Sequence, residues 1–376
     1  MVKALVVGGV GVTGTIIVEE LLRRDYDVTV LHRGVHEADL SRRVKHIHAD
    51  PHWREDLQPA LEGQTYDLVV GVYGRLRFVA ETLLGRTPRM ISIGGAMAVY
   101  KGWMPITAEN PWDRMEDSPL FVREDNPLAR LPGVDSFSRQ VRDSEDFVME
   151  AHRAGHFNAT HLRYPIVYGP LHLGPPEWAI IRRVRDGRRR LILPGAGASL
   201  LSRGFSRNLV HAIMLAHDHP DTSAGQIYNI CDDGLLSNRQ WVGLLSQILG
   251  HEFELVDVPF NFLPKGFRAT ATQLLYPFHR VMDSSKFKSQ LGYRDIVSVE
   301  QALEETVKWY TDHPLVPGGE EEQNLGDPYD YAYEDALMDI YAKRAGEIRE
   351  AFAAEKGIPV KWRHPYPHPK KRGDLR

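Results

Sequence analysis

The chain has a single cysteine, almost no net charge and no long hydrophobic run, and each absence excludes a class of protein. Cys231 cannot form an internal disulfide and has no second thiol with which to build a zinc or redox motif. The 46 basic and 50 acidic residues leave a net charge of -4, so no strong field attracts nucleic acid or an acidic membrane. No segment reaches the roughly 18 consecutive uncharged apolar residues of a membrane-spanning helix. We therefore expect a cytoplasmic globular protein that binds neither nucleic acid nor membrane.

The start of the sequence has the pattern of a strand, a tight turn and a helix. The apolar run "KALVVGG" leads into "VTGTIIVEELLRR", whose apolar residues recur at helical spacing. Glycines interrupt the run and glutamates follow it, so we do not expect a signal peptide. Gly8, Gly11 and Gly14 let the turn close and let the backbone approach a pyrophosphate at the N-terminus of the helix. The pattern predicts a dinucleotide-binding loop made of these glycines together with Val12 and Thr13.

The end of the next strand, "DVTVLHRG", indicates which dinucleotide binds. NAD-preferring proteins usually have an acidic residue here that accepts hydrogen bonds from the adenosine ribose, whereas this sequence has His32 followed by Arg33. An acid would repel a ribose 2′-phosphate, but a guanidinium binds it through paired hydrogen bonds. The pair therefore favours NADP over NAD as the cofactor. The alternative interpretation of Arg33 is a solvated loop position.

Further strand-like runs alternate with helical ones along the sequence. One of them, "KHIHAD", ends at Asp50, and the others are "YDLVVGVYG", "RMISIGGAMAVYKG" and "NATHLRYPIVYGP". This alternation predicts an α/β fold on a Rossmann-type doubly wound parallel sheet, with the cofactor across the carboxyl ends of the strands. Asp50 is expected where the third strand meets the adenosine part of the cofactor.

Three later segments extend the pattern far beyond the glycine loop. "LRYPIVYGP" spans 162–170, "GQIYNICDD" spans 225–233, and "MDSSKFKSQLGYRDIVSVEQALEETVKWY" spans 282–310. Together with the glycine loop, they resemble the extended short-chain dehydrogenase/reductase superfamily, in its NAD-dependent epimerase/dehydratase group, over residues 3–312.

The resemblance implies a division of the chain and a place for the nicotinamide. Tyr164 and Pro165 are expected to border that ring. Many relatives dimerise through helices of the cofactor domain, so a homodimer is expected by analogy. The expected boundaries are 1–170, with returning segments 204–235 and 281–293, for the dinucleotide-binding domain; 171–203, 236–280 and 294–312 for a smaller C-terminal substrate lobe; and 313–376 for a linker, a helical extension and a tail.

The catalytic set that the resemblance implies is missing from its usual positions. Members of the superfamily transfer hydride with a serine or threonine, a tyrosine and a lysine. Aligning Glu145 with the glutamate that follows the family lysine puts Val141 at the lysine position and Phe137 at the tyrosine position. Gly95 and Ala96 stand where the serine is expected. Because hydride moving to a carbonyl leaves an alkoxide that must be protonated, and phenylalanine supplies no proton, the ordinary mechanism is not expected.

Four residues in loops at the expected carboxyl edge of the sheet are candidates to replace that set. They are Tyr73, Tyr100, Lys101 and Tyr164. For Tyr100 the alternative interpretation is packing, whereas Lys101 would supply the missing cation. Ser92 lies earlier and is expected inside the fifth strand.

The chain has 17 histidines, but their spacing predicts no metal site. The clusters "HIHADPHW" and "RHPYPHP" lack the helical or CxxC-like spacing that fixes a metal ion. We therefore predict no catalytic metal.

Three functions remain open from the sequence. The first is an NADP-dependent oxidoreductase or epimerase/dehydratase-like enzyme with a displaced acid or base, acting on a small organic carbonyl or alcohol. The second is a nucleotide-bound enzyme that performs non-redox chemistry, such as lyase or hydrolase chemistry. The third is an NADP(H)-binding regulator without catalysis. The retained substrate-lobe pattern favours an enzyme with a small-molecule substrate.

Overall fold

The computed structural model divides the chain into two units. The described residues are 2–34, 40, 43–72, 76–103, 118–129, 136–263 and 278–353. The first unit is Met1–Tyr329 and the second is Asp330–Arg376. The cofactor and substrate regions predicted from the sequence fall within the first unit.

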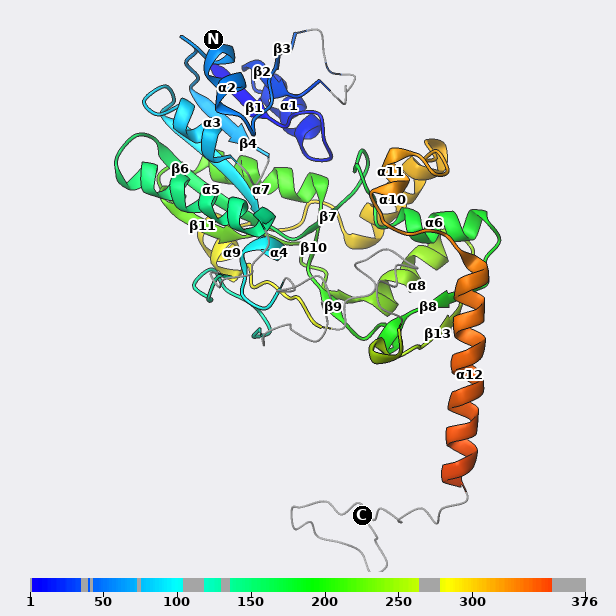
Figure 1. Ribbon diagram of the computed structural model, residues 1–376. Coiled ribbons are helices and arrows are strands. Elements are labelled where there is room, and N and C mark those ends of the chain that lie inside the picture. Colours follow the sequence, from blue (N-terminus) through cyan, green and yellow to red (C-terminus); the bar gives the residue numbers. More distant parts are fainter. Residues whose placement is uncertain are drawn as a thin grey trace, which may run out of the picture. The chain divides into compact units, whose positions relative to one another are not determined.

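A parallel sheet of seven strands forms the centre of the first unit (Figure 1). Its strands are β1 Lys3–Val7, β2 Asp27–His32, β3 Lys45–His48, β4 Leu68–Gly71, β5 Arg89–Gly95, β6 Asn158–Tyr164 and β11 Gln226–Asn229. Their order is β11-β6-β5-β4-β1-β2-β3, and every pairing is parallel. The direction of winding reverses between β1 and β4, and a doubly wound sheet binds its ligand at such a reversal. The predicted Rossmann-type sheet is confirmed.

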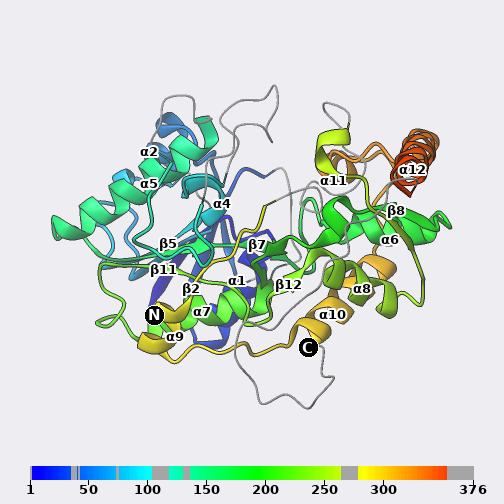
Figure 2. The same ribbon diagram turned by 90° about the horizontal axis from the view of Figure 1, so that it is seen from below.

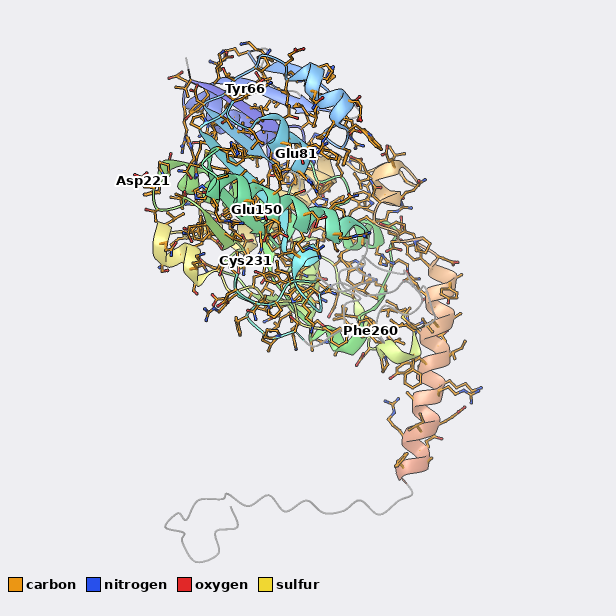
Figure 3. All side chains as sticks on the ribbon, turned by 60° about the vertical axis from the view of Figure 1, so that its left-hand side comes forward. Tyr66, Glu81, Glu150, Asp221, Cys231 and Phe260 are labelled. Atoms are coloured by element: carbon orange, nitrogen blue, oxygen red, sulfur yellow. The ribbon has the colours of Figure 1, made fainter. Side chains whose placement is uncertain are left out.

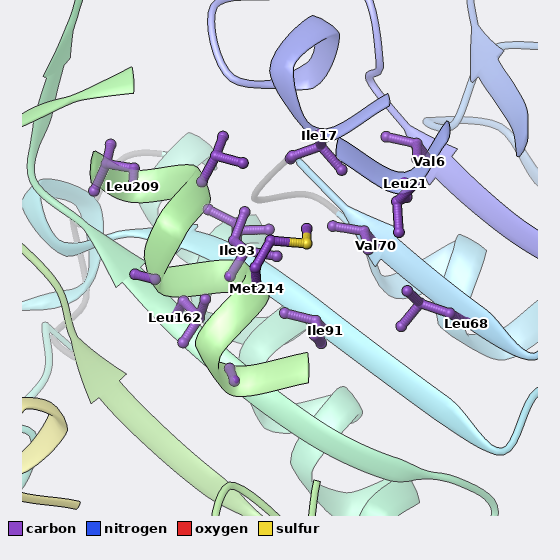
Figure 4. Packing of buried hydrophobic residues seen from close by; sticks show 14 of the residues in the cluster. Val6, Ile17, Leu21, Leu68, Val70, Ile91, Ile93, Leu162, Leu209 and Met214 are labelled. Atoms are coloured by element: carbon purple, nitrogen blue, oxygen red, sulfur yellow. The ribbon is translucent and has the colours of Figure 1, made fainter. Parts of the chain in front are cut away.

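Helices cover both faces of this sheet because its strands are apolar on both. The helices around it are α1 Gly14–Arg23, α2 Arg54–Ala60, α3 Arg77–Thr82, α4 Ala96–Val99, α5 Ser136–Arg153, α7 Ser206–Asp218 and α9 Ser285–Leu291. Successive strand residues point to opposite faces. Val6 therefore packs with α1 and α7, through Ile17 and Leu209, whereas Leu5 packs with α2, α3 and α5. Figure 4 shows the first of these two clusters.

The smaller lobe has a hydrophobic cluster of its own. Its elements are β7 Ile166–Tyr168, β8 Arg190–Ile192, β9 Leu200–Leu201, β10 Arg203–Phe205, β12 Leu236–Ser237, β13 Glu254–Val256, α6 Trp178–Arg185, α8 Asn238–Ile248 and α10 Val299–Asp312, with 3-10 turns at Pro194–Gly197 and Phe260–Phe262. Trp178 of α6, Trp241 of α8 and Leu303 of α10 share the cluster, and Figure 2 shows these helices grouped together. A capping box of Ser237 and Gln240 begins α8, which fixes where that helix starts.

The stretch after α10 packs onto the lobe. It contains α11, Glu320–Gln323. Asp327 forms a fully buried ion pair with Arg183 of α6, with 2.6 Å between Oδ2 and Nη1. Trp178 Nε1 donates to Glu322 Oε1 at 2.9 Å. Residues up to Tyr329 therefore belong to the first unit.

The described part of the second unit is dominated by one helix. This helix, α12, runs over Tyr331–Ala353. Ile340, Ile348 and Phe352 are exposed along it. Nowhere in the described ranges does a helix have both the length and the apolar character needed to cross a membrane.

Candidate functional site

The glycine loop joins β1 to α1 and is closed so tightly that it accepts no larger residue at its last glycine. A Cβ on Gly14 would lie 2.7 Å from the Cα of Gly9 and nearer still to the carbonyl oxygen of Gly8. Gly8 itself has φ +85°, a conformation that residues with a Cβ rarely adopt. At Gly11, in contrast, a Cβ would meet nothing within 4 Å. The first and last glycines thus shape the loop, and Gly11 leaves one side of it open.

The open side of the loop faces a pocket of about 230 Å³. Gly8 and Gly11 line the pocket from the loop, His32 and Arg33 line it from the end of β2, and His52 lines it after β3. Gly8, Gly11, His32 and Arg33, among the predicted cofactor residues, are therefore brought to one cavity at the carboxyl edge of the sheet. The N-terminus of α1 lies at the same loop and favours a bound phosphate.

Two charged residues lie at or near this pocket: Arg33, which lines it, and Asp50, which contacts the pocket residue His52. Arg33 is exposed at the rim. Asp50 accepts a hydrogen bond from the backbone N–H of His52 at 3.0 Å. Burial alone would raise the pKa of Asp50, but the contacts with His52 and the charge of Arg33 hold it below its ordinary value. The Asp50 carboxylate is thus engaged by the protein, and the end of β2 presents no acid to a ribose phosphate.

The remaining predicted cofactor residues lie around the loop. Val12 is half-buried and Thr13 is buried at the start of α1. Tyr164, at the end of β6, is buried in the cluster under α1 and α7, with its hydroxyl beside Thr13. Burial raises the pKa of Tyr164. Pro165 follows it and is also buried. Tyr164 supports the glycine loop from below, and as placed it presents no open hydroxyl to a substrate.

The helix that would carry the missing tyrosine and lysine is α5. Phe137 near its start is 47% exposed, whereas Val141 one turn later is 1% exposed. Val141 packs in a hydrophobic cluster with Tyr100 and Trp103 after β5 and with Cys231 after β11. Figure 3 labels Cys231, one member of this cluster. The position expected for lysine is thus part of the apolar core.

A chain of buried polar side chains lies beneath the carboxyl end of β5. Ser92 of β5 bonds His161 of β6, with 2.7 Å between Oγ and Nδ1. Nε2 of His161 lies 3.1 Å from Glu145 of α5. The carboxylate of Glu145 also accepts from Arg163, at 2.6 Å and 2.9 Å. Ser92 stands inside β5, as predicted.

The electrostatics of this chain are those of a strong buried ion pair. Burial alone would raise the pKa of Glu145, but His161 and Arg163 hold it well below its usual range. Burial alone would lower the pKa of Arg163, but Glu145 raises it above its ordinary value. All three side chains are at most 3% exposed. Glu145 is therefore ionised and inaccessible to a substrate.

The candidate replacements for the catalytic set do not converge on one point. The Tyr100 hydroxyl donates to Asn229 Oδ1 and accepts from Arg163 Nη1, both at 2.7 Å, and burial raises the pKa of Tyr100 to about 12. Lys101 is exposed, and its backbone N–H donates to Pro127. Tyr100 and Tyr164 belong to different hydrophobic clusters. Tyr73 lies outside the described residues. The structure places Lys101 alone among the described candidates at the surface.

Sequence reasoning missed the role of His161 and Arg163. The signal was present, because "THLR" places both side chains on the same face of a strand, at positions i and i+2. That face is turned to α5, where Glu145 completes the ion pair. The sequence also offers Glu145 on the facing helix. A buried carboxylate needs a basic partner, which here is Arg163.

The comparisons with known proteins agree with this architecture. Residues 119–231 match the family described as NAD dependent epimerase/dehydratase. Sterol-4-alpha-carboxylate 3-dehydrogenase, decarboxylating, of Mus musculus is 25% identical over 348 residues, which cover 81% of this chain and 90% of the mouse protein. dTDP-glucose 4,6-dehydratase of Streptomyces griseus is 29% identical over 185 residues, which cover 47% of this chain and 52% of that protein.

Solved structures share the fold at low sequence identity. UDP-glucose 4-epimerase of Thermotoga maritima, solved with UDP-glucose, has a TM-score of 0.66 at 18% identity, over 83% of this chain and 99% of that one. dTDP-glucose 4,6-dehydratase of Bacillus anthracis, solved with NAD, has a TM-score of 0.62 at 16% identity, over 86% of this chain and all of that one. The family match over residues 119–231 and the shared sheet thus agree with the resemblance of this chain to the NAD-dependent epimerase/dehydratase group of the extended short-chain dehydrogenase/reductase superfamily.

Proposed function

We propose that this chain binds NADP(H) in the pocket beside the glycine loop and acts as an oxidoreductase on a small organic carbonyl or alcohol, without the usual tyrosine and lysine. The single observation that carries the proposal is the pocket of about 230 Å³, in which Gly8, Gly11 and Arg33 meet. The tight loop and the N-terminus of α1 suit a pyrophosphate. Arg33, without an acid at the end of β2, suits a 2′-phosphate.

The fit of the pocket to the cofactor follows from its donors. Backbone amides of the loop and the guanidinium of Arg33 are hydrogen-bond donors, which phosphate oxygens require. The nicotinamide cofactor, when bound, supplies the hydride or accepts it. The chain supplies orientation, because Tyr164 and Thr13 fix the loop from below. Cofactor-binding residues in this proposal are Gly8, Gly11, Val12, Thr13, Gly14, His32, Arg33, Asp50, Tyr164 and Pro165.

Proton delivery to the substrate oxygen is the step in which this chain differs from its relatives. Tyr100 already donates to Asn229, so its hydroxyl proton is engaged. Lys101 is exposed beside it, and its side chain is an amine that can donate hydrogen bonds. We propose Lys101, or water that it orients, as the donor, with Tyr73 as the second candidate. In either case the alkoxide formed by hydride transfer receives its proton from a group outside α5.

The relatives suggest which substrates to test first. The mouse relative is a dehydrogenase of sterol carboxylates, and the Streptomyces relative is a dehydratase of dTDP-glucose. We propose that the substrate is an alcohol or ketone of one of these two classes, and that the active form is a homodimer. Light scattering of the purified protein tests the dimer directly.

A non-redox activity is the second candidate, and one observation favours it. Val141 fills the lysine position with an apolar contact, so the chain has no buried cation next to a tyrosine on α5. A bound nucleotide would then organise the cleft for elimination or hydrolysis. Failure of hydride transfer by a protein that binds NADP(H) would favour this candidate, or a regulator without catalysis.

Calorimetric titration of NADP and NAD into the nucleotide-free protein tests the cofactor. Arg33→Ala is expected to weaken NADP binding by roughly 10- to 100-fold, because a charge-assisted hydrogen bond contributes about 1.5–3 kcal/mol. NAD binding should change little. The control is Arg153→Ala, an exposed arginine at the end of α5. Equal losses for NADP and NAD would remove the 2′-phosphate assignment.

Hydride transfer is tested with NADPH carrying deuterium at C4 of the nicotinamide. The protein is incubated with sterol ketones and with keto-sugar nucleotides, and deuterium in the product is measured by mass spectrometry. Deuterium in an alcohol product supports the oxidoreductase. A protein that binds NADPH tightly and transfers no deuterium to either class contradicts it.

A further inference from the structure

Three histidines at the edge of the sheet lie close enough to share a metal ion. His32 ends β2, and His46 and His48 lie in β3, the strand paired with it. One ring nitrogen or the other from each side chain lies within 4.8 Å of those of the other two. We propose that His32, His46 and His48 bind one divalent transition-metal ion, with Zn²⁺ as the reference ion.

The pairing of the two strands creates this cluster. His32 is opposite His48, and Val30 is opposite His46. Residues i and i+2 of a strand share a face, so both histidines of β3 stand beside His32. Spacing along the sequence predicted no metal because it takes no account of the neighbouring strand. The three histidines therefore form a candidate metal site where the sequence predicted none.

The cluster is accessible from one side. β3 is the last strand of the sheet, and His46 and His48 are exposed, whereas His32 is buried. A Cβ on Gly34 would lie 3.6 Å from Cδ2 of His48, so the turn after β2 packs against that ring. An ion therefore reaches the cluster from solvent and is held against the buried ring of His32.

The distances suit a tetrahedral ion after a small adjustment. Nε2 of His32 and Nδ1 of His46 are 2.9 Å apart. Zn–N bonds of about 2.0–2.1 Å place two ligand nitrogens roughly 3.3 Å apart. The nitrogens of His32 and His46 must therefore move apart by about 0.4 Å, and the ligand nitrogen of His48 must move toward them by at most about 1.5 Å. Rotation of the exposed His48 ring supplies the larger of these movements.

The protons of the cluster show what an ion would replace. The backbone N–H of Gly34 donates to Nδ1 of His32 at 3.2 Å, so that nitrogen carries the lone pair. In the neutral ring, Nε2 of His32 then carries the proton and donates it to Nδ1 of His46. An ion at Nε2 takes the place of this proton, which moves to Nδ1 and breaks the bond from Gly34. Because a donor rather than an acceptor stands behind His32, we expect binding roughly 10- to 100-fold weaker than at a site whose histidine is held by an acceptor.

The ligand set selects the kind of ion. Imidazole nitrogens bind Zn²⁺, Ni²⁺, Co²⁺ and Cu²⁺, whereas Mg²⁺ and Ca²⁺ require oxygen ligands. Three protein ligands leave a fourth position for water. His32 also lines the pocket beside Arg33. A bound ion would therefore add positive charge at the same edge of the sheet, whether or not a nucleotide binds there.

The test uses the full chain without a histidine tag, treated with a chelator and then dialysed. Calorimetry with ZnCl₂ is expected to give one ion per chain, and MgCl₂ is expected to give no binding. Titration with CoCl₂ is expected to produce visible absorption bands of a four-coordinate site. No saturable binding of Zn²⁺ or Co²⁺ would overturn the proposal, and NADP titration of the same preparation would show separately whether the cofactor pocket is intact.

Variants assign the ion to the three histidines. The double variant His46→Ala/His48→Ala removes two exposed rings, and we expect it to weaken Zn²⁺ binding by at least roughly tenfold. The matched control is His219→Ala/His313→Ala, in which two exposed histidines at the ends of α7 and α10 are removed. The single variant His48→Gln serves if the double variant unfolds, with circular dichroism as the check. Equal binding by the His46/His48 variants and the wild type would overturn the assignment.

Discussion

The β1–α1 side and the β5–α5 side of the sheet's carboxyl edge differ in what they offer a ligand. On the β1–α1 side, the glycine loop has the closed backbone that a pyrophosphate needs, and it opens onto a pocket. On the β5–α5 side, Phe137 and Val141 stand at the positions expected for the tyrosine and lysine, and Glu145, His161 and Arg163 form a buried ion-pair network. The features that suit cofactor binding and the positions expected to carry the acid and base therefore lie on different elements of the same sheet, and one can be present without the other.

The difference has a physical reason. The loop is built from backbone, so Gly14 cannot be exchanged without displacing the residues it contacts. The expected catalytic set is built from side chains on a helix, and a helix can hold phenylalanine and valine at these positions without a change in its backbone path. A change at Gly14 therefore moves the backbone of the loop, whereas phenylalanine and valine at positions 137 and 141 change which chemical groups α5 offers.

The largest effect is expected from removing the charge of Glu145. Glu145→Gln keeps the shape of the side chain but leaves Arg163 and His161 without their carboxylate. Breaking a buried pair in this way costs about 3–5 kcal/mol in the free energy of unfolding. Chemical denaturation measures it, with Glu150→Gln, an exposed position on the same helix that Figure 3 labels, as the control. Equal stabilities of the two variants would show that the network is not what holds α5 to the sheet.

The same carboxylate also determines a response to acid. The folded pKa of Glu145 lies below its ordinary value of 4.5, so its contribution to stability is complete above pH 4.5 and is lost as the pH falls through the folded value. The wild type should therefore lose stability more steeply than Glu145→Gln below pH 4.5. Denaturation at a series of pH values checks this, and parallel curves would contradict it.

The next effect is expected from restoring the lysine. Val141→Lys places a charged amine in a cluster where Val141 is 1% exposed, and we expect a loss of roughly 2–4 kcal/mol in the free energy of unfolding. Phe137→Tyr is the control, because that position is half exposed and should change stability by less than about 0.5 kcal/mol. A stable Phe137→Tyr/Val141→Lys variant with new dehydrogenase activity would show that the cluster around Val141 can accommodate a lysine. The β5–α5 side could then support acid–base chemistry.

The smallest effect distinguishes two glycines of one loop. Gly14→Ala forces a Cβ against Gly8 and Gly9, so we expect a loss of about 1–3 kcal/mol together with weaker NADP binding. Gly11→Ala meets nothing within 4 Å, so thermal unfolding should be unchanged while NADP binding weakens. Thermal melts and calorimetry on both variants separate the two roles. Similar melts for both would mean that the loop is looser than its geometry indicates.

Much of the fold was predictable because it depends on patterns among residues that are close together in the sequence. The β-branched runs gave the strands, their alternation gave the parallel sheet, and the glycine spacing gave the loop at Gly8–Gly14. The position of Ser92 inside β5 followed from the same pattern. These features depend on residues near one another in the sequence.

The site was less predictable because it depends on residues far apart in the sequence. Nothing near Tyr100 in the sequence indicates that its hydroxyl would be engaged by Arg163 and Asn229. Asn208 shows the same limit, because its side-chain oxygen accepts hydrogen bonds from the backbone N–H groups of Ile296 and Val297, which lie far along the chain. Parallel register, which brings His48 beside His32, is likewise absent from any single stretch of sequence.

The packing of Val141 also bears on how such a chain can change over time. Its neighbours come from the segments after β5 and β11, as well as from Val122 and Met282. Lysine at position 141 alone would place a charged amine among these apolar neighbours, so changes at the neighbours would have to accompany it. A new acid or base is therefore accommodated more easily at an exposed position such as Lys101 than at Val141 on α5.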